Sequence, residues 1–175
     1  MTLLLGVDPG ACGAAALVEW PSRRLVRWWV WTTLERNGKP DAIRMKPGYL
    51  FEFGSVFEVG DIIANEVDDE SSFVTISVEG LFSIGQSCIP LAESCGELMG
   101  PLREATRKPI RRPLSREWRP RILGIPATTK KGPAEAAAVR WAEGLGLLGP
   151  EHAALTKAER GALAEACAIA LWGAL

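Results

Sequence analysis

The chain begins with an apolar run of strand length that ends in a single carboxylate. Residues 3–7 carry no charged side chain on either face, which is typical of a strand buried on both sides of a sheet. Asp8 follows this run, and a Pro-Gly pair then turns the chain. Gly13 and the alanines after it are expected to let a second strand, residues 12–19, lie close to the first. Asp8 therefore ends a central strand, either as a turn former or as a metal ligand with other acids beside it.

The pattern along the rest of the chain predicts three more strands and five helices. Residues 34–49 show no clear period and are expected to form a loop. The predicted strands are 3–7, 12–19, 25–32, 73–78 and 109–113, and the predicted helices are 51–65, 90–107, 116–122, 133–145 and 156–172. We expect a kink or break near Pro101 and a helix N-cap at Ser115. This order predicts a single α/β domain over residues 1–175, with a mixed five-stranded sheet and helices on both faces.

A second buried strand also ends in an acid. Residues 73–78 have the composition of a buried strand, and Glu79 and then Gly80 follow them. Ligands collect at the carboxyl ends of strands in open α/β sheets. The sequence therefore places Asp8 and Glu79 at the ends of two central strands, where one ligand could meet both.

The last predicted helix contains a third acid. Thr156 and Glu159 form a capping box, and the alanine-rich helix after them is expected to pack closely on the sheet. Glu165 lies among small and apolar residues and needs a partner there. Three carboxylates suit a hard cation such as Mg²⁺, and two such ions can promote phosphodiester hydrolysis. Lys130 or Lys131 could neutralise the charge that builds on the phosphate.

The distribution of charge points to a polyanionic partner. The whole chain has a net charge of −1, and an acidic group gathers at residues 66–70. Residues 103–131 contain ten Lys or Arg and only two Glu, a net charge of +8. Because a solvated face usually mixes both signs, such an excess indicates a polyanionic binding partner.

Other side chains carry weaker signals. The cysteines form no Cys-x-x-Cys pair and are expected to be buried free thiols; they are Cys12, Cys88, Cys95 and Cys167. His152 lies in a Gly-Pro-Glu-His linker and is expected at the surface. The aromatic group Trp28, Trp29 and Trp31 is expected to pack in the sheet, with base stacking as the alternative. The apolar runs are too short for a signal peptide or a membrane helix, which predicts a cytoplasmic protein.

Four segments in order resemble the RuvC family of Holliday-junction resolvases, within the RNase H-like or retroviral integrase superfamily. They are Gly6-Val7-Asp8-Pro9-Gly10, Val78-Glu79-Gly80-Leu81-Phe82, the Lys130-Lys131 pair before a helix, and Glu165-Ala166-Cys167-Ala168-Ile169-Ala170-Leu171. The first segment alone also fits actin-like and sugar kinases, but their later phosphate loops do not occur here. The resemblance covers nearly the whole chain and implies an RNase H-like fold.

The resemblance also implies a metal site. Asp8 and Glu79 match the family's first two metal ligands, and Glu165 stands where the family usually has Asp. These three residues would hold two Mg²⁺, with Mn²⁺ as a substitute, and Lys131 would assist the reaction. The family normally has another acid or a His three residues earlier, where this chain has Ala162. The second metal is therefore expected to be held more loosely.

The resemblance implies contacts with DNA and a second subunit. Phe82 matches an aromatic residue that meets bases near the junction centre. The residues expected to hold the DNA backbone are Arg111, Arg112, Arg116, Arg119, Lys130 and Lys131. A homodimer would nick two strands symmetrically, and Gly96 and Gly100 suit a close two-fold contact.

The sequence therefore predicts a Mg²⁺-dependent endonuclease that resolves four-way DNA junctions and leaves 5′-phosphate and 3′-hydroxyl ends. One alternative is another nuclease of this fold that cuts RNA in RNA–DNA hybrids. A second is a dimer that binds branched DNA without cutting it, because Ala162 weakens the metal site. An actin-like nucleotide-binding domain fits the chain poorly.

Overall fold

The computed structural model describes residues 1–36, 39–47, 49–52, 56–68, 74–80 and 89–175. The strands are β1 (Thr2–Asp8), β2 (Cys12–Trp20), β3 (Arg24–Arg36), β4 (Lys39–Lys46), β5 (Tyr49–Glu52), β6 (Val74–Val78) and β7 (Ile110–Arg111). The helices are α1 (Val56–Asp68), α2 (Ile89–Thr106), α3 (Ser115–Trp118), α4 (Lys131–Gly144) and α5 (Lys157–Trp172). A π-helical turn, η3 (Arg119–Leu123), continues α3, and a 3₁₀ turn, η4 (Pro150–His152), precedes α5. No helix in these ranges is long and apolar enough to span a membrane.

One mixed sheet forms the middle of the molecule. Its strand order is β5-β4-β3-β2-β1-β6-β7. The strands from β1 to β5 pair antiparallel with their sequence neighbours, whereas β6 pairs parallel with β1 and with β7. The prediction of a mixed α/β sheet is confirmed.

The predicted count of five strands is wrong, because the described sheet has seven. The additional strands β4 and β5 lie in residues 34–49, expected as a loop, and at the start of the helix expected at 51–65. Burial alternates along β4: Ile43 and Met45 are buried, and Arg44 between them is exposed. This alternation of period two is typical of a strand with one buried face. The charged residues of the segment obscure the apolar period in the sequence.

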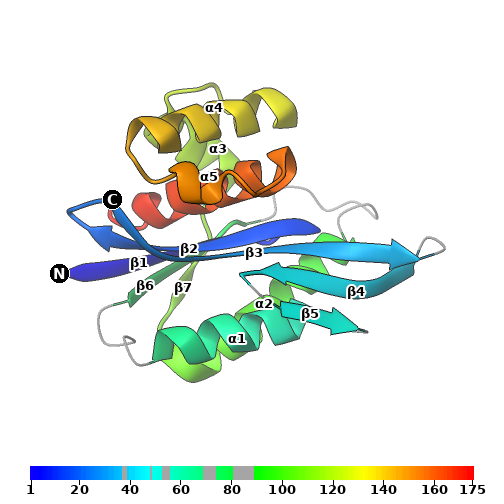
Figure 1. The fold of residues 1–175 in the computed structure, drawn as a ribbon. Coiled ribbons are helices and arrows are strands. Elements are labelled where there is room, and N and C mark those ends of the chain that lie inside the picture. Colours follow the sequence, from blue (N-terminus) through cyan, green and yellow to red (C-terminus); the bar gives the residue numbers. More distant parts are fainter. Residues whose placement is uncertain (37–38, 48, 53–55, 69–73, 81–88) are drawn as a thin grey trace.

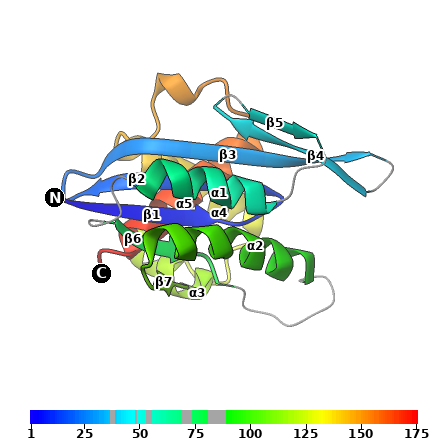
Figure 2. The same ribbon diagram turned by 90° about the horizontal axis from the view of Figure 1, so that it is seen from below.

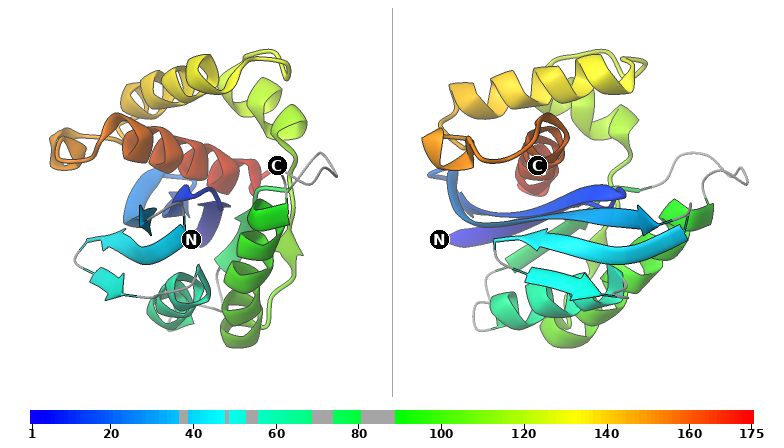
Figure 3. Two further views of the ribbon diagram at one scale, coloured as in Figure 1. Left: turned by 90° about the vertical axis from the view of Figure 1, so that its right-hand side faces the viewer. Right: turned by 45° about the vertical axis from the view of Figure 1, so that its right-hand side comes forward.

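Helices cover both faces of the sheet, as the sequence predicted. Figure 1 shows α4 and α5 above the sheet and α1 and α2 below it, and Figure 3 shows the three layers from two further sides. Alternate residues of β1 supply the two cores: Leu3 and Leu5 pack with α1 and α2, and Leu4 packs with α5. In Figure 2, α1 and α2 lie side by side across the lower face.

The alanine-rich helix α5 packs directly on β1, which confirms the expected close contact. A Cβ atom on Gly6 would overlap the backbone of Ala166 and Ala170. Only a strand residue without a side chain permits this approach. The second strand lies beside the first as expected, since β2 pairs with β1, and a Cβ on Gly13 itself would meet the indole of Trp31 on β3.

Several helix ends differ from the prediction. Helix α1 begins at Val56 rather than at residue 51, since residues 51 and 52 belong to β5. Helix α2 runs through Pro101 without ending there. Ser115 is the first residue of α3 rather than its cap, and the carboxylate of Glu117 accepts the Leu114 N–H instead. At α5 the Thr156–Glu159 capping box is confirmed.

The aromatic residues and the histidine belong to the core. Trp29 and Trp31 are buried, so the packing interpretation is confirmed and base stacking is excluded for these two. The surface prediction for His152 is wrong: the side chain is 2% exposed. Its Nδ1 atom accepts the Gly149 N–H, and its ring lies against that of Trp28. Of the cysteines, Cys95 and Cys167 are buried and free, Cys12 is partly exposed, and Cys88 lies outside the described residues.

Candidate active site

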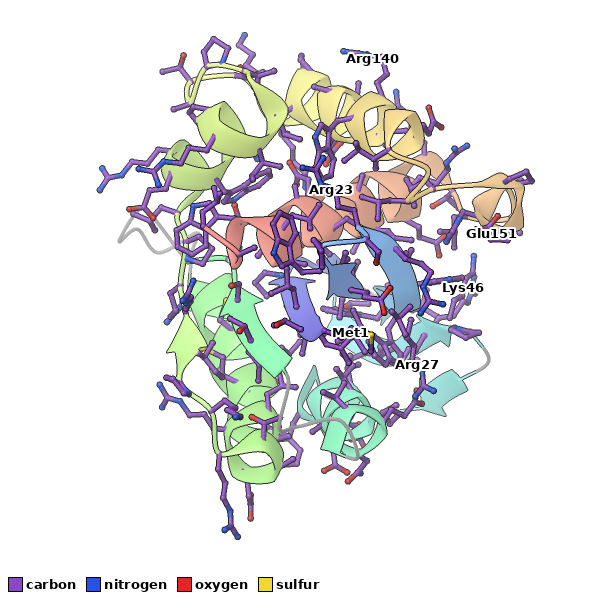
Figure 4. The ribbon with its side chains drawn as sticks, turned by 90° about the vertical axis from the view of Figure 1, so that its left-hand side faces the viewer. Met1, Arg23, Arg27, Lys46, Arg140 and Glu151 are labelled. Atoms are coloured by element: carbon purple, nitrogen blue, oxygen red, sulfur yellow. The ribbon has the colours of Figure 1, made fainter. Side chains whose placement is uncertain are left out.

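The fold brings the three acids into one cavity. Because β1 and β6 are parallel neighbours, Asp8 and Glu79 leave the sheet at the same edge, where the Glu79 N–H donates to the carbonyl of Val7 at 2.9 Å. Helix α5 crosses β1 and supplies Glu165. All three carboxylates line a cavity of about 250 Å³. Figure 4 views the opposite end of the molecule, where Met1 precedes β1.

Glu79 is held by a buried tryptophan. The indole Nε1 of Trp118, at the end of α3, donates to Oε1 of Glu79 at 3.1 Å. Trp118 is fully buried and packs against Ala168 and Ile169 of α5. The short helix after β7 therefore links the acid at the end of β6 to the helix that carries Glu165.

The Glu165 carboxylate is held by Arg119, the residue that follows Trp118 in the chain. Arg119 Nη2 donates to Oε1 of Glu165 at 3.1 Å, and both side chains are largely buried. The Arg119 guanidinium also lies 5.3 Å from the centre of the Trp118 ring, within the range of a cation–π contact. Glu165 thus has the partner that its apolar surroundings require.

The cavity holds more negative charge than its surroundings compensate. Burial, followed by the charges of Glu79 and Glu165, raises the pKa of Asp8 well above its usual value. Burial also raises the pKa of Glu79, against the opposing effects of Trp118 and Arg119. Burial raises the pKa of Glu165 to about 7, although Arg119 opposes this. A group of carboxylates with raised pKa values is typical of a site that binds a cation or a proton.

The donor atoms in the cavity suit a hard divalent cation. Glu79 and Glu165 each use Oε1 in the bonds above, and the second oxygen of each makes no hydrogen bond to a described residue. Within the described ranges, no three His, Cys, Asp or Glu side chains lie close enough together to form a ready-made metal site. The donor chemistry, carboxylate oxygens, fits a hard cation such as Mg²⁺.

Of the two lysines predicted to lie beside the acids, Lys131 lines the cavity and Lys130 does not. Lys131 begins α4 and lines the cavity, with its side chain 86% exposed and its Nζ 3.6 Å from Oε1 of Glu135. Lys130 is the N-cap residue of α4 and is exposed. Of the two, the structure brings Lys131 to the acids.

Ala162, at the position where the resemblance leads one to expect an acid or a His, also lines the cavity. Ala162 is on α5 and lines the cavity beside Glu165, where a methyl group offers no donor atom. Glu159 does not replace the missing ligand: its Oε2 accepts from Lys46 at 2.9 Å and from the Thr156 N–H at 2.7 Å. These bonds outweigh the effect of burial and lower the pKa of Glu159. The Glu159 carboxylate is therefore occupied by the capping box and by Lys46.

The predicted DNA-binding residues occupy different settings. Arg112 and Arg116 are exposed, and Arg111 donates from Nη1 to the carbonyl of Gly173 at 2.8 Å, at the end of α5. Arg119 points into the acid cavity. Phe82 lies outside the described residues.

Sequence reasoning missed Trp118. Its hydrogen bond to Glu79 spans 39 positions in the chain, so no local spacing reveals it. The sequence offers one indication of its role. Trp118 is a large apolar residue within a short stretch of charged ones, which predicts that its side chain is buried even in a basic segment.

A second cavity, of about 350 Å³, lies beside the first. It is lined by residues of α4 and α5 and by the segment before α5, including Val139, Leu155 and Arg160. Its one carboxylate is Glu135, which also lines the acid cavity. The acids that the sequence singled out gather only in the smaller cavity.

Comparison with known proteins supports the fold. No family model and no curated protein sequence matches the chain. A structure of Thermus thermophilus RuvC is 22% identical over 97% of this chain and 92% of that chain, with a TM-score of 0.49. The structure of T. thermophilus RuvC in complex with a Holliday junction substrate is 18% identical over 98% of this chain and 91% of that chain, with a TM-score of 0.52. The chain has the RuvC fold. The match to the RuvC complex spans almost the whole chain, which confirms the expected RNase H-like architecture.

Proposed function

We propose that this protein is a divalent-metal-dependent endonuclease that resolves four-way DNA junctions. The observation that carries the proposal is the meeting of Asp8, Glu79 and Glu165 in one cavity at the edge of a RuvC-type sheet. The structural neighbour bound to a Holliday junction substrate supports the choice of DNA.

In this proposal Asp8, Glu79 and Glu165 together hold two Mg²⁺, with Mn²⁺ as a substitute. Bound Mg²⁺ supplies Lewis-acid stabilisation of phosphate charge and a water nucleophile at neutral pH. Lys131, at the mouth of the cavity, approaches the phosphate and offsets the charge that develops on it. Cleavage leaves 5′-phosphate and 3′-hydroxyl ends.

The DNA backbone lies along the basic segment that surrounds the cavity. Arg112, Arg116 and Lys130 are exposed there, and Arg111 and Arg119 are anchored to α5. Phe82 follows β6 closely in the sequence, and we assign it the contact with bases at the junction centre. Two copies of the chain act together, and the exposed Gly96 and Gly100 of α2 offer the contact surface.

A second candidate function is binding of branched DNA without cleavage. One observation favours it: Ala162 lines the cavity where a fourth donor would complete the site. The described residues also lack a ready-made cluster of three ligands. In this case the same surfaces bind the junction, and metal has no effect on binding or on the DNA.

Cleavage of a mobile four-way junction tests the proposal. The assay compares the junction with linear duplex and with an RNA–DNA hybrid, each with and without Mg²⁺ or Mn²⁺. Paired symmetric nicks in the junction alone, only with metal, are the expected result. Cleavage of the hybrid alone would assign the protein to ribonuclease H-type activity. Tight junction binding without any cleavage would establish the non-catalytic alternative.

A further inference from the structure

Two adjacent residues, Trp118 and Arg119, each donate a hydrogen bond to one oxygen of a carboxylate in the acid cavity. Trp118 Nε1 bonds to Oε1 of Glu79, and Arg119 Nη2 bonds to Oε1 of Glu165. The other oxygen of each glutamate makes no hydrogen bond to a described residue. Carboxylates that ligate metals are commonly oriented in this way, with one oxygen held by a protein donor.

We propose that Trp118 is a positioning residue, whose indole N–H orients the Glu79 carboxylate toward the metal. This inference rests on the proposed function, because it concerns how the same site binds its cation. The indole N–H is a neutral donor and has no acceptor function. It therefore fixes the carboxylate without adding a positive charge that would oppose the cation.

Packing alone does not account for this hydrogen bond. The indole N–H groups of Trp31 and Trp172 are buried and have no hydrogen-bond partner. The fold thus tolerates an unpaired buried indole at two positions. The indole N–H groups of Trp29 and Trp118 both donate to carboxylates, of Glu66 and Glu79, and of these two acids only Glu79 lines the acid cavity. The Trp118 ring also packs against Ala168 and Ile169 on the helix of Glu165, so its position is fixed relative to two of the three acids.

Trp172 provides a matched control. It packs in the same small cluster as Trp118, and its buried N–H donates to no described residue. Replacing either indole with phenyl removes one N–H and similar volume. Only the change at Trp118 removes a bond to a candidate metal ligand, so a difference between the two variants isolates that bond.

The experiment measures Mn²⁺ affinity rather than activity. Free Mn²⁺ is followed by electron paramagnetic resonance during titration of the wild type, Trp118→Phe, Trp172→Phe and Asp8→Asn. A fifth protein carries 3-benzothienylalanine at position 118, which keeps the bicyclic shape and replaces the N–H with sulfur. We expect both changes at position 118 to weaken Mn²⁺ binding about tenfold, as is usual for lost outer hydrogen bonds, and Trp172→Phe to leave it unchanged.

Each outcome is decisive. Wild-type affinity in the benzothienylalanine protein would overturn the inference, even if Trp118→Phe fails to fold. Equal weakening by Trp172→Phe would also overturn it, because the effect would then come from packing. If the wild type binds Mn²⁺ no better than Asp8→Asn, the proposed metal site itself is wrong. The positioning role of Trp118 is then wrong as well. Wild-type binding above Asp8→Asn, with no effect at position 118, removes the inference and leaves the proposed function intact.

Discussion

Arg119 Nη2 lies 3.1 Å from Oε1 of Glu165, in an ion pair whose side chains are 13% and 7% exposed. The guanidinium gives one acid a counter-charge while Asp8 and Glu79 remain without an ion-pair partner among the described residues. A buried pair of this kind is costly to break from one side, because the remaining charge is left uncompensated. The same guanidinium also repels any cation that enters the cavity.

Replacing Arg119 with methionine is therefore expected to have opposite effects with and without metal. Without metal and at pH 8, above the raised pKa of Glu165, the variant should lose a few kcal/mol of unfolding free energy, because the ionised Glu165 loses its partner. Its Mn²⁺ affinity should rise, because repulsion between the guanidinium and the cation disappears. Thermal unfolding across a Mn²⁺ series measures both effects. A Mn²⁺ affinity below that of the wild type would show that Arg119 orients Glu165 rather than opposing the metal.

Asp8→Asn should separate binding from cleavage. The amide keeps the size of the side chain and removes its charge, so the fold and the DNA surface remain. Loss of a charged metal ligand removes several kcal/mol of transition-state stabilisation, which corresponds to at least about a thousandfold slower cleavage. Junction binding, measured by gel shift without metal, should stay within about threefold of wild type. Cleavage at the wild-type rate would contradict the assignment of Asp8.

The stability of the metal-free protein should fall as the pH rises from 5 to 8. The pKa of Glu165 is raised from 4.5 to about 7, so the folded state retains a proton that the unfolded state has lost across this window. Because the folded state binds more protons, its free energy of unfolding decreases with pH, on the order of 3 kcal/mol from this group. Asp8 and Glu79 shift in the same direction. Urea unfolding at several pH values measures the slope.

Glu165→Gln provides the control for this pH effect. The variant cannot ionise at position 165, so its stability should decrease less steeply between pH 5 and 8. Addition of Mn²⁺ at pH 8 should raise the stability of the wild type more than that of the variant, since the ionised carboxylate binds the cation. Identical pH profiles for the two proteins would contradict the raised pKa of Glu165.

Gly6→Ala should destabilise the fold strongly. The added Cβ would overlap the backbone of α5, and neither the central strand nor the helix can move without disturbing the sheet. We expect a loss of about 3 kcal/mol or more in the free energy of unfolding. Gly132→Ala, in the first turn of α4, meets nothing within 4 Å and should be neutral or slightly stabilising. Similar stability of both variants would show that β1 and α5 are further apart than described.

Arg111 and Arg112 should differ although they are adjacent. Arg112→Ala is expected to reduce the dependence of DNA affinity on salt by about one unit of slope, without loss of stability. Arg111→Ala should reduce the same slope and also lower stability by about 1 kcal/mol, because its bond to the Gly173 carbonyl disappears. Fluorescence anisotropy at several salt concentrations, together with thermal unfolding, separates the two. An unchanged slope for Arg112→Ala would exclude a phosphate contact at that residue.

The parts of the fold that sequence could predict follow from local patterns. Strands β1 and β6 are apolar runs with an acid at the end, and the cap of α5 is a short motif, so both were found. The burial of His152 was not predictable in this way, because it depends on Trp28, more than a hundred residues earlier. Likewise, Glu79 and Glu165 could be recognised as misplaced acids, but their partners Trp118 and Arg119 became visible only in three dimensions.

The acids of the cavity are distributed along nearly the whole length of the chain: Asp8 belongs to the first strand and Glu165 to the last helix. During synthesis, β1 and β6 emerge from the ribosome well before α5. A growing chain thus carries its basic segment, residues 103–131, before the third acid exists. The cavity is completed only when α5 docks on β1 at Gly6, so the proposed nuclease stays inactive until folding is essentially finished.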